Sequence, residues 1–174
     1  MKVFVTEKYM KNAFDKITQL QKELENIRRE KNISFEGDTN TWHDNFAYEQ
    51  LTREEQQTAK LLADLSSEFS NMQIISFNPN MNDIKTVGLY CHVCVNQENL
   101  TSGTITEKQF DIVPLGNENI TENIYAYNAP LIKPLMGLNP GEDVTVVLPT
   151  GETQITVLSV EASDINKIEN AKKR

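Results

Sequence analysis

The sequence predicts an α+β protein, with an N-terminal antiparallel coiled-coil helical hairpin followed by a β-rich C-terminal domain. The first half is rich in Glu, Lys, Gln and Leu, has no proline before Pro79, and repeats apolar residues at spacings of three and four. The second half holds short runs of β-branched residues bounded by turn signals. We therefore expect a hairpin domain over 1–76, a linker over 77–83, a β-rich domain over 84–162 and a polar tail over 163–174.

The charge of the chain argues against a protein that binds bare nucleic acid. The net charge is -8, and neither half is basic: residues 1–76 carry 10 basic and 13 acidic side chains, and residues 77–174 carry 7 and 12. Binding to a bare phosphate backbone generally requires a basic surface. We therefore expect any action on nucleic acid to pass through a protein partner.

Nothing in the sequence indicates a membrane protein. No apolar run approaches the roughly 20 residues that span a bilayer. The N-terminal residues do not form a secretory signal, because no apolar run there is followed by a small-residue cleavage site. We expect no membrane association and a cytoplasmic location.

Two heptad seams predict the hairpin. The first seam comprises Met10, Ala13, Ile17, Leu20, Leu24, Ile27, Lys31 and Ser34. The second comprises Tyr48, Leu51, Glu55, Thr58, Leu62, Leu65, Phe69 and Met72. Most positions in each seam are apolar, which predicts a buried interface between two helices. Antiparallel pairing places Ile17 opposite Leu65 and Leu20 opposite Leu62, with the turn near residue 41.

The predicted turn, near 36–45, is acidic. Gly37 is the expected end of the first helix, and Glu36, Asp38 and Asp44 lie on or beside the connecting loop. One interpretation is a solvated turn in which Asp38 and Asp44 cap helices. The other is a pair of carboxylates that offers oxygen ligands to a divalent cation. Trp42, the only tryptophan, either folds back onto the turn or is an exposed anchor for a partner.

Three basic residues, Arg28, Arg29 and Lys31, lie on the first helix below the tip. They form either a solvated face that makes local ion pairs with Glu25 and Glu30, or a contact with an RNA end or an acidic partner. The sequence alone leaves both interpretations open.

Cys91 and Cys94 form a C-x-x-C pattern in the predicted strand 87–95. Residues three apart on a strand point to opposite faces, so the two sulfur atoms diverge. We expect two reduced thiols without bound zinc or a disulfide, in preference to a metal site or a redox pair.

The second half predicts four strands and one short helix. The strands are expected at 87–95, 104–113, 144–148 and 154–160. The turn at 149–152 makes the last two strands a hairpin. The short helix is expected over 129–136, with Pro130 near its first turn and Gly137 after its end.

The segment 128–144 carries the most specific pattern in the chain. Ala129 and Pro130 would open a short helix, Leu135-Met136-Gly137 would close it, and Gly141-Glu142-Asp143-Val144 would turn into a strand. This pattern resembles the C-terminal signature of the Gre (GreA/GreB) family of bacterial transcript-cleavage factors. The resemblance implies an FKBP-like fold for the C-terminal domain.

The hairpin tip resembles the same family. The family tip carries Gly-Asp, then two residues, then Glu-Asn, and a Tyr four residues after that Glu. Gly37-Asp38 matches the first part, and Asp44-Asn45 with Tyr48 matches the second, with Asp in place of Glu. Five residues separate Asp38 from Asp44 where the family has two between its acids, and Trp42 falls in this enlarged loop.

The resemblance implies a partner and a mechanism. The hairpin would enter the secondary channel of a bacterial multisubunit RNA polymerase, and the β-rich domain would dock on the channel rim. Asp38 and Asp44 would help to hold a second Mg²⁺ in the polymerase active site, and the polymerase would cleave the 3′ end of backtracked RNA. The chain would be a cofactor of that reaction, not an enzyme, and would hold no Mg²⁺ when alone.

Further residues are candidates for contact. The candidates at the tip are Glu36, Trp42, Asn45 and Tyr48, and the candidates for a contact with RNA or the partner are Arg28, Arg29 and Lys31. One alternative is a paralogue that enters the same channel and inhibits transcription because its tip is altered. Another is an FKBP-like prolyl isomerase or chaperone, for which the available aromatic residues are Tyr90, Phe110, Tyr125 and Tyr127. A purely structural coiled-coil protein is less favoured because of the C-terminal signature.

Overall fold

The computed structural model describes residues 2–37, 46–77, 84–149, 151–164 and 168. The chain divides into two compact units. The hairpin unit contains residues 1–3 and 7–74, and the β unit contains residues 4–6 and 75–174. Among the described residues, no helix is both long and apolar enough to cross a membrane.

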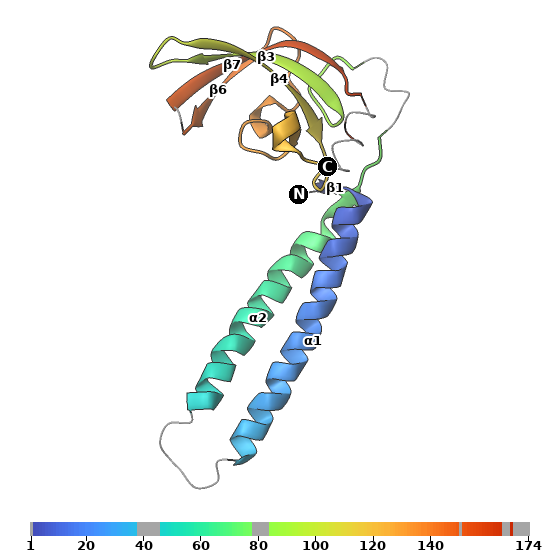
Figure 1. Ribbon diagram of the computed structural model, residues 1–174, viewed down its shortest axis with the longest axis vertical. Helices are drawn as coiled ribbons and strands as arrows, with labels where there is room; N and C mark the ends of the chain where they lie inside the picture. The colour runs from blue at the N-terminus through green and yellow to red at the C-terminus, as the bar shows by residue number, and fades with distance from the viewer. Residues whose placement is uncertain (1, 38–45, 78–83, 150, 165–167, 169–174) are drawn as a thin grey trace. The chain divides into compact units, whose positions relative to one another are not determined.

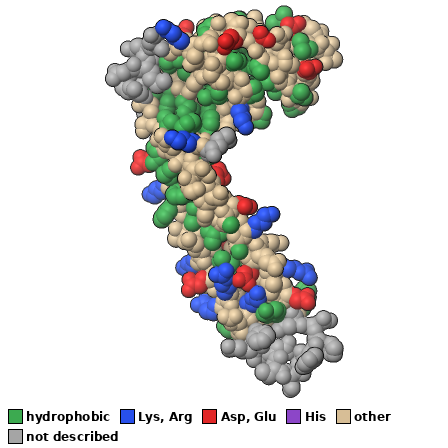
Figure 2. Space-filling model, turned by 180° about the vertical axis from the view of Figure 1, so that it is seen from behind, with side chains coloured by type: hydrophobic (Ala, Val, Ile, Leu, Met, Phe, Trp, Pro, Cys, Tyr) green, Lys and Arg blue, Asp and Glu red, His purple; other side chains and the backbone are tan. Residues whose placement is uncertain are grey.

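The hairpin unit consists of two long helices that run side by side (Figure 1). Helix α1 spans Glu7–Gly37 and helix α2 spans Phe46–Ser70. Helix α1 ends at the predicted Gly37. On the face drawn in Figure 2, charged side chains of both signs are interspersed along this unit, as expected for two helices that bury only one stripe each.

The predicted heptad seams are the least exposed stripes of the two helices. On α1, five consecutive seam residues are at most 9% exposed: Ala13, Ile17, Leu20, Leu24 and Ile27. On α2, no residue is fully buried, but every predicted seam position is partly covered. The rings of Phe14 and Phe69 lie 6.2 Å apart, as the antiparallel pairing of Ala13 with Phe69 requires. The prediction differs at one end only, because α2 ends at Ser70 and Met72 lies in strand β2.

The β unit contains a five-stranded sheet in the order β5-β4-β3-β7-β6. Its strands are β3 Cys91–Asn99, β4 Ile105–Val113, β5 Ile124–Ala126, β6 Asp143–Leu148 and β7 Gly151–Ala162. All neighbours are antiparallel except β4 and β5, which are parallel. The predicted hairpin between the last two strands is confirmed, with Leu148 opposite Gly151.

One face of the sheet curls over the segment that follows β5 (Figure 1). Strand residues that point to this face alternate with exposed ones, as the burial of β3 and β7 shows. Ile132 and Leu135 of the covering segment are fully buried against Val93, Phe110 and Ile155. This apolar layer is the core of the β unit.

Three elements of the β unit differ from the prediction. Strand β3 begins at Cys91 and not at residue 87, because Tyr90 adopts a left-handed backbone (φ 61°) that interrupts extended structure. The predicted helix over 129–136 is reduced to turns and a three-residue 3-10 helix, η2 Lys133–Leu135, with Pro134 inside it. Strand β5 was not predicted.

Residues 4–6 also depart from the predicted domain limits, because they belong to the β unit. Val5, in strand β1 Val3–Val5, is fully buried and bridges to Leu115. The N–H of Thr6 donates to Leu115 O at 2.9 Å, and the N–H of Leu115 donates to Phe4 O at 3.1 Å. Strand β2 is Met72–Ile74, and 3-10 helix η1 is Ile120–Glu122.

The two cysteines point to opposite faces of β3, as predicted. Cys91 is buried in the core, and burial raises the pKa of its thiol. Cys94 lies on the outer face, where its Sγ donates to Glu107 Oε1 at 3.3 Å. Partial desolvation and then the Glu107 carboxylate raise the pKa of this thiol as well. Both environments therefore favour the protonated thiol at neutral pH.

The predicted polar tail is only partly described. Residues 165–167 and 169–174 lie outside the described residues. Ile168 is fully buried and packs with Tyr90, Val113 and Ile124. This residue departs from the predicted polar tail, because its apolar side chain belongs to a second small core.

Candidate functional site

The acidic tip predicted from the sequence lies largely outside the described residues. This holds for Asp38, Trp42, Asp44 and Asn45, and for Glu36 only the helical backbone is described. Their spatial arrangement and their ability to bind Mg²⁺ therefore stay predictions. Among the described residues, no group of three or more His, Cys, Asp or Glu side chains could hold a metal ion.

The helices that carry the tip are joined by a polar cluster, which we call the Glu55 clasp: Arg28, Lys31, Tyr48 and Glu55. Arg28 Nε donates to Glu55 Oε1 at 2.9 Å, and Lys31 Nζ donates to Glu55 Oε2 at 2.8 Å. The ammonium of Lys31 also lies 5.2 Å from the centroid of the Tyr48 ring. The carboxylate of Glu55 therefore accepts hydrogen bonds from two cations of the opposite helix, and one of them, Lys31, also packs on the Tyr48 ring.

The clasp is half-sheltered from solvent. The side chains of Lys31 and Glu55 are 20% and 21% exposed, whereas that of Arg28 is 59% exposed. Hydrogen bonds from Lys31 and then Arg28 lower the pKa of Glu55. The hydrogen bond to Glu55 in turn raises the pKa of Lys31. Both groups therefore keep their charges at neutral pH, and the pair holds the helices where the apolar seam has ended.

The clasp changes the interpretation of the basic cluster. Arg28 and Lys31 were expected to face either solvent, with local partners Glu25 and Glu30, or an RNA end. Instead they share Glu55 of the other helix. Arg29 differs from both, because its Nη2 donates to the neutral side chain of Asn26 at 3.1 Å on the exposed surface.

Sequence reasoning did not identify Glu55 as a partner of these cations. A signal was present, because Glu55 occupies a seam position that is otherwise apolar and lies within two turns of Lys31 in the predicted pairing. A carboxylate at such a position needs a cation from the facing helix, since an unpaired half-buried charge is costly.

The signature segment 128–144 is explained by backbone geometry. Gly137 and Gly141 both have a φ of 90°, a conformation that L side chains rarely adopt. The N–H of Gly137 donates to Val87 O at 2.8 Å, and the N–H of Gly141 donates to Val157 O at 2.8 Å. Glu142 Oε2 accepts from the N–H of Asn139 at 2.7 Å. The pattern therefore specifies two tight turns that attach the covering segment to the sheet.

Two of the four aromatic residues considered for an isomerase pocket line one cleft. Phe110 and Tyr125 line an open cleft of about 440 Å³ in the β unit, and their rings meet edge to face at 5.9 Å. Tyr90 and Tyr127 are not among its lining residues within the described part of the chain. Tyr90 instead donates its hydroxyl to Ile75 O, and the Tyr127 hydroxyl accepts from the N–H of Phe4.

Residues 82–162 match the family model described as the C-terminal domain of the transcription elongation factors GreA and GreB. The resemblance of the chain to the Gre family is confirmed, because the family model matches the β domain and a curated GreA factor is among the relatives. Members of this family are transcription factors and are not themselves enzymes.

Individual relatives agree with this family. The chain is 32% identical over 62 residues to the transcription elongation factor GreA of Helicobacter hepaticus, a match that covers 34% of this chain and 38% of that relative. The chain thus aligns with about two fifths of that relative's length.

Solved structures with similar chains include GreA factor homolog 1 (Gfh1) of Thermus thermophilus, at 16% identity and a TM-score of 0.40, covering 93% of this chain and 100% of that one. Another is a GreA/GreB factor of Nitrosomonas europaea, at 14% identity and a TM-score of 0.37, covering 92% and 98%.

Proposed function

We propose that this chain is a cytoplasmic cofactor of bacterial multisubunit RNA polymerase. Its hairpin enters the secondary channel and stimulates the polymerase's own cleavage of backtracked RNA. The observation that carries the proposal is the joining of a GreA/GreB C-terminal domain at 82–162 to a helical hairpin with carboxylates at its turn. The acidic net charge agrees with action through a protein partner, because neither half of the chain carries the net positive charge that binding to a bare RNA backbone generally requires.

In this proposal Asp38 and Asp44 extend carboxylate oxygens toward the polymerase active site. A second Mg²⁺ held there jointly with the polymerase supplies Lewis-acid stabilisation and lowers the pKa of bound water. The chain's own residues position these carboxylates, with Glu36 as a further candidate. Trp42, Asn45 and Tyr48 contact the surroundings of the tip.

The Glu55 clasp supports the tip. Arg28 and Lys31 are engaged with Glu55 at 2.9 and 2.8 Å, so their role is to hold the distal helices in register. Arg29, whose described contact is with a neutral amide, is the member of the basic cluster assigned to the RNA end or to the polymerase wall. In this proposal Arg29 is therefore a contact residue, and Arg28 and Lys31 are supporting residues.

The test is RNA cleavage in a stalled, backtracked elongation complex, with polymerase binding measured in parallel. Replacing Asp38 or Asp44 by Asn removes a charge and keeps the side-chain shape. We expect cleavage to fall sharply, because a neutral amide is a much poorer Mg²⁺ ligand than a carboxylate. Binding should persist, since the rest of the hairpin and the β domain are unchanged. Folding stability should change by about 1 kcal/mol at most, through a weakened helix cap.

Three outcomes separate the alternatives. Binding by the wild type without stimulated cleavage at any Mg²⁺ concentration would replace this proposal by the inhibitory paralogue, for which the five residues between Asp38 and Asp44 are the motivating feature. Full activity of both Asn variants would move the ligand role to Glu36. Absence of polymerase binding would remove the proposal altogether.

A further inference from the structure

One edge of the five-stranded sheet is only partly covered. Strand β5 pairs with β4 at three positions, from Asp111 to Val113. Just before β5, Asn123 adopts a left-handed backbone with φ 56°, and its N–H turns back to Ile120 O. The chain therefore leaves the line of β5 at that point. Residues 105–109 of β4 are all exposed, and no described strand pairs with them on the β5 side, which leaves an edge about 17 Å long.

The free backbone groups on this edge can be identified. The N–H of Asp111 donates to Asn123 O at 2.9 Å, so the backbone groups of Asp111 face the β5 side. Backbone groups alternate along an antiparallel strand, so those of Gln109, Glu107 and Ile105 face the same side. Within the described part of the chain, none of the hydrogen bonds found outside the sheet ladders involves the backbone of these three residues.

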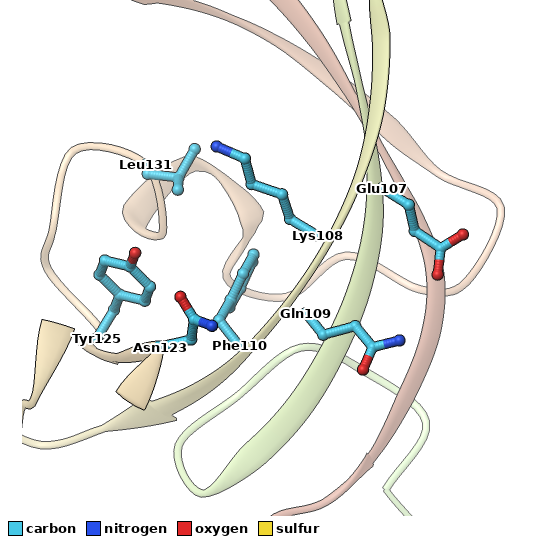
Figure 3. Close-up of a pocket in the computed structure, with 7 residues that line it drawn as sticks. All are labelled: Glu107, Lys108, Gln109, Phe110, Asn123, Tyr125 and Leu131. Carbon is cyan, nitrogen blue, oxygen red and sulfur yellow. The ribbon is translucent and has the colours of Figure 1, made fainter. Parts of the chain in front are cut away.

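A cleft adjoins this edge on the core side of the sheet. Lys108 and Phe110 of β4 point toward Leu131 of the covering segment, and Tyr125 of β5 lies beside Phe110 (Figure 3). Leu131 is half-buried and Phe110 is buried. The cleft therefore offers an apolar wall next to an open strand edge.

Lys108 supplies an unpaired positive charge in this cleft. Its ammonium makes no ion pair or hydrogen bond with any residue that the structure describes. Glu107 and Gln109 also line the cleft, but their side chains point away from Lys108 and Leu131 (Figure 3), and Glu107 Oε1 accepts a hydrogen bond from the Cys94 thiol on the outer face. An acidic group beside Lys108 would therefore meet a cation while the Glu107 carboxylate points to the other face.

We propose that the edge from Ile105 to Phe110, with its adjoining cleft, binds an extended acidic peptide segment of a partner protein by strand addition. The peptide backbone pairs with the edge-facing groups of Glu107 and Gln109. Alternate side chains of the peptide point into the cleft, where an apolar residue packs on Phe110 and an acidic residue two positions away lies beside Lys108. This inference concerns the β unit alone and is independent of the proposed cleavage function.

A second copy of this chain is a poorer occupant of the edge. Antiparallel self-pairing centred on Lys108 places two lysines directly opposite each other, and self-pairing centred on Glu107 opposes two glutamates, both of which are destabilising. A lysine on an edge strand can also serve only to discourage pairing. The Lys108→Glu variant distinguishes this protective role from recognition of an acidic peptide.

The probe is the fluorescein-labelled peptide Thr-Leu-Thr-Glu-Thr-Leu-Thr with blocked ends, titrated with the full chain and followed by fluorescence anisotropy. Its alternating pattern presents an apolar and an acidic residue two positions apart in either chain direction. The matched control peptide carries Lys in place of Glu. We expect the Glu peptide to bind the wild type at least about tenfold more tightly than the Lys peptide, and Lys108→Glu to reverse this order.

Strand addition is tested through the backbone. The N–H of Gln109 faces the open edge, so Gln109→Pro removes a peptide-binding donor without removing a bond to β3. We expect Gln109→Pro to abolish binding and Gln109→Ala to retain it, with circular dichroism confirming that both variants fold. Two further peptides, N-methylated at the Thr positions or at the Leu and Glu positions, should differ, because only one set faces β4.

Several results would overturn this proposal. One is no saturable binding of any probe by the wild type. Another is equal binding of the two N-methylated peptides, which would indicate a side-chain pocket without strand pairing. A third is equal affinity of the Lys108→Glu variant for the Glu peptide and the Lys peptide, which would mean that Lys108 only discourages strand pairing at this edge. A concentration-dependent dimer that Gln109→Pro dissolves would make a second copy the occupant.

Discussion

Glu55 is the charged residue in the mostly apolar, partly covered seam of α2. Its pKa is lowered in the folded hairpin, so the unfolded chain takes up a proton at higher pH than the folded chain does. The stabilisation is therefore present above the ordinary value of 4.5 and is lost as the pH falls through the lower, folded value. An exposed ion pair contributes little, but two cations on one half-sheltered carboxylate form a network that holds the distal helices together.

We predict that Glu55→Gln lowers hairpin stability by about 0.5–1 kcal/mol at pH 7 and removes the acid-dependent loss. The measurement is hydrogen exchange of the distal helices, followed by mass spectrometry at neutral pH and near pH 4. Glu49→Gln is the matched control, because Glu49 is 62% exposed and pairs with Arg53 at 3.7 Å. If both variants exchange alike at pH 7, the clasp contributes no more than an ordinary surface pair.

Tyr90 shows what residue patterns do not reveal about a strand boundary. The run from residue 87 is β-branched and apolar, which predicts an early strand start. In the structure Tyr90 has a φ of 61°, its N–H donates to Ile112 O at 2.6 Å, and its hydroxyl donates to Ile75 O at 3.1 Å. These contacts come from distant parts of the chain, so no local signal could have placed the turn there.

At the scale of the element, the α1 seam is the main apolar interface of the hairpin unit. Leu20 is 3% exposed at the middle of that seam, whereas Leu61 on α2 is 51% exposed. Leu65, the residue opposite Ile17, is only partly covered, so a truncation there should cost less than the same truncation of Leu20. The exposed fractions of these side chains therefore predict which truncations cost the most stability.

We predict that Leu20→Ala destabilises the hairpin unit by about 2–5 kcal/mol, through lost burial and a residual cavity. Leu61→Ala should change stability by no more than about 0.5 kcal/mol. Chemical denaturation followed by helical circular dichroism measures both. Similar losses for the two variants would contradict the seam assignment.

The helices were predictable because their information is local and repeated. Seam residues recur over eight positions in α1 and seven in α2, so one misplaced residue does not change the period. Strands β1 and β5 have three residues each and no period to detect. They exist because Val5 meets Leu115 and because residues 124–126 pair with β4, which are contacts that only the assembled fold creates.

The parts of the candidate sites also differ in how far the sequence predicts them. The acidic tip and the signature segment were visible as motifs, since their chemistry lies in consecutive residues. The Glu55 clasp required the reach of two long side chains across the hairpin. The open β4 edge required the position of β5, because β5 begins only opposite Asp111 and leaves residues 105–109 without a neighbour on that side. The open edge follows from topology and has no sequence signature, whereas the clasp had one signal, the carboxylate of Glu55 at a seam position.

At the scale of the whole molecule, the β unit depends on a segment that precedes the hairpin in sequence. We predict that Val5→Ala lowers the stability of the β unit by about 2 kcal/mol, because Val5 is fully buried there and two methyl groups are lost. Hydrogen exchange should increase in β4 and β5 and stay unchanged in the middle of α1. Val3→Ala is the control, since Val3 belongs to the hairpin unit and is only partly buried. Unchanged exchange in β4 and β5 would show that the segment contributes nothing to the β unit.

The same feature has a consequence for the order of events during synthesis. Val5 and its bridging partner Leu115 are separated by 110 positions (115 − 5), and β7 is made later still. At a translation rate of about 5–20 residues per second, Val5 waits about 5–20 s for Leu115. The hairpin unit, which contains residues 1–3 and 7–74, can close during that interval. The nascent chain thus holds a folded helical hairpin while the β unit is still incomplete, and residues 4–6 reach their contacts in the β unit only after Leu115 has been made.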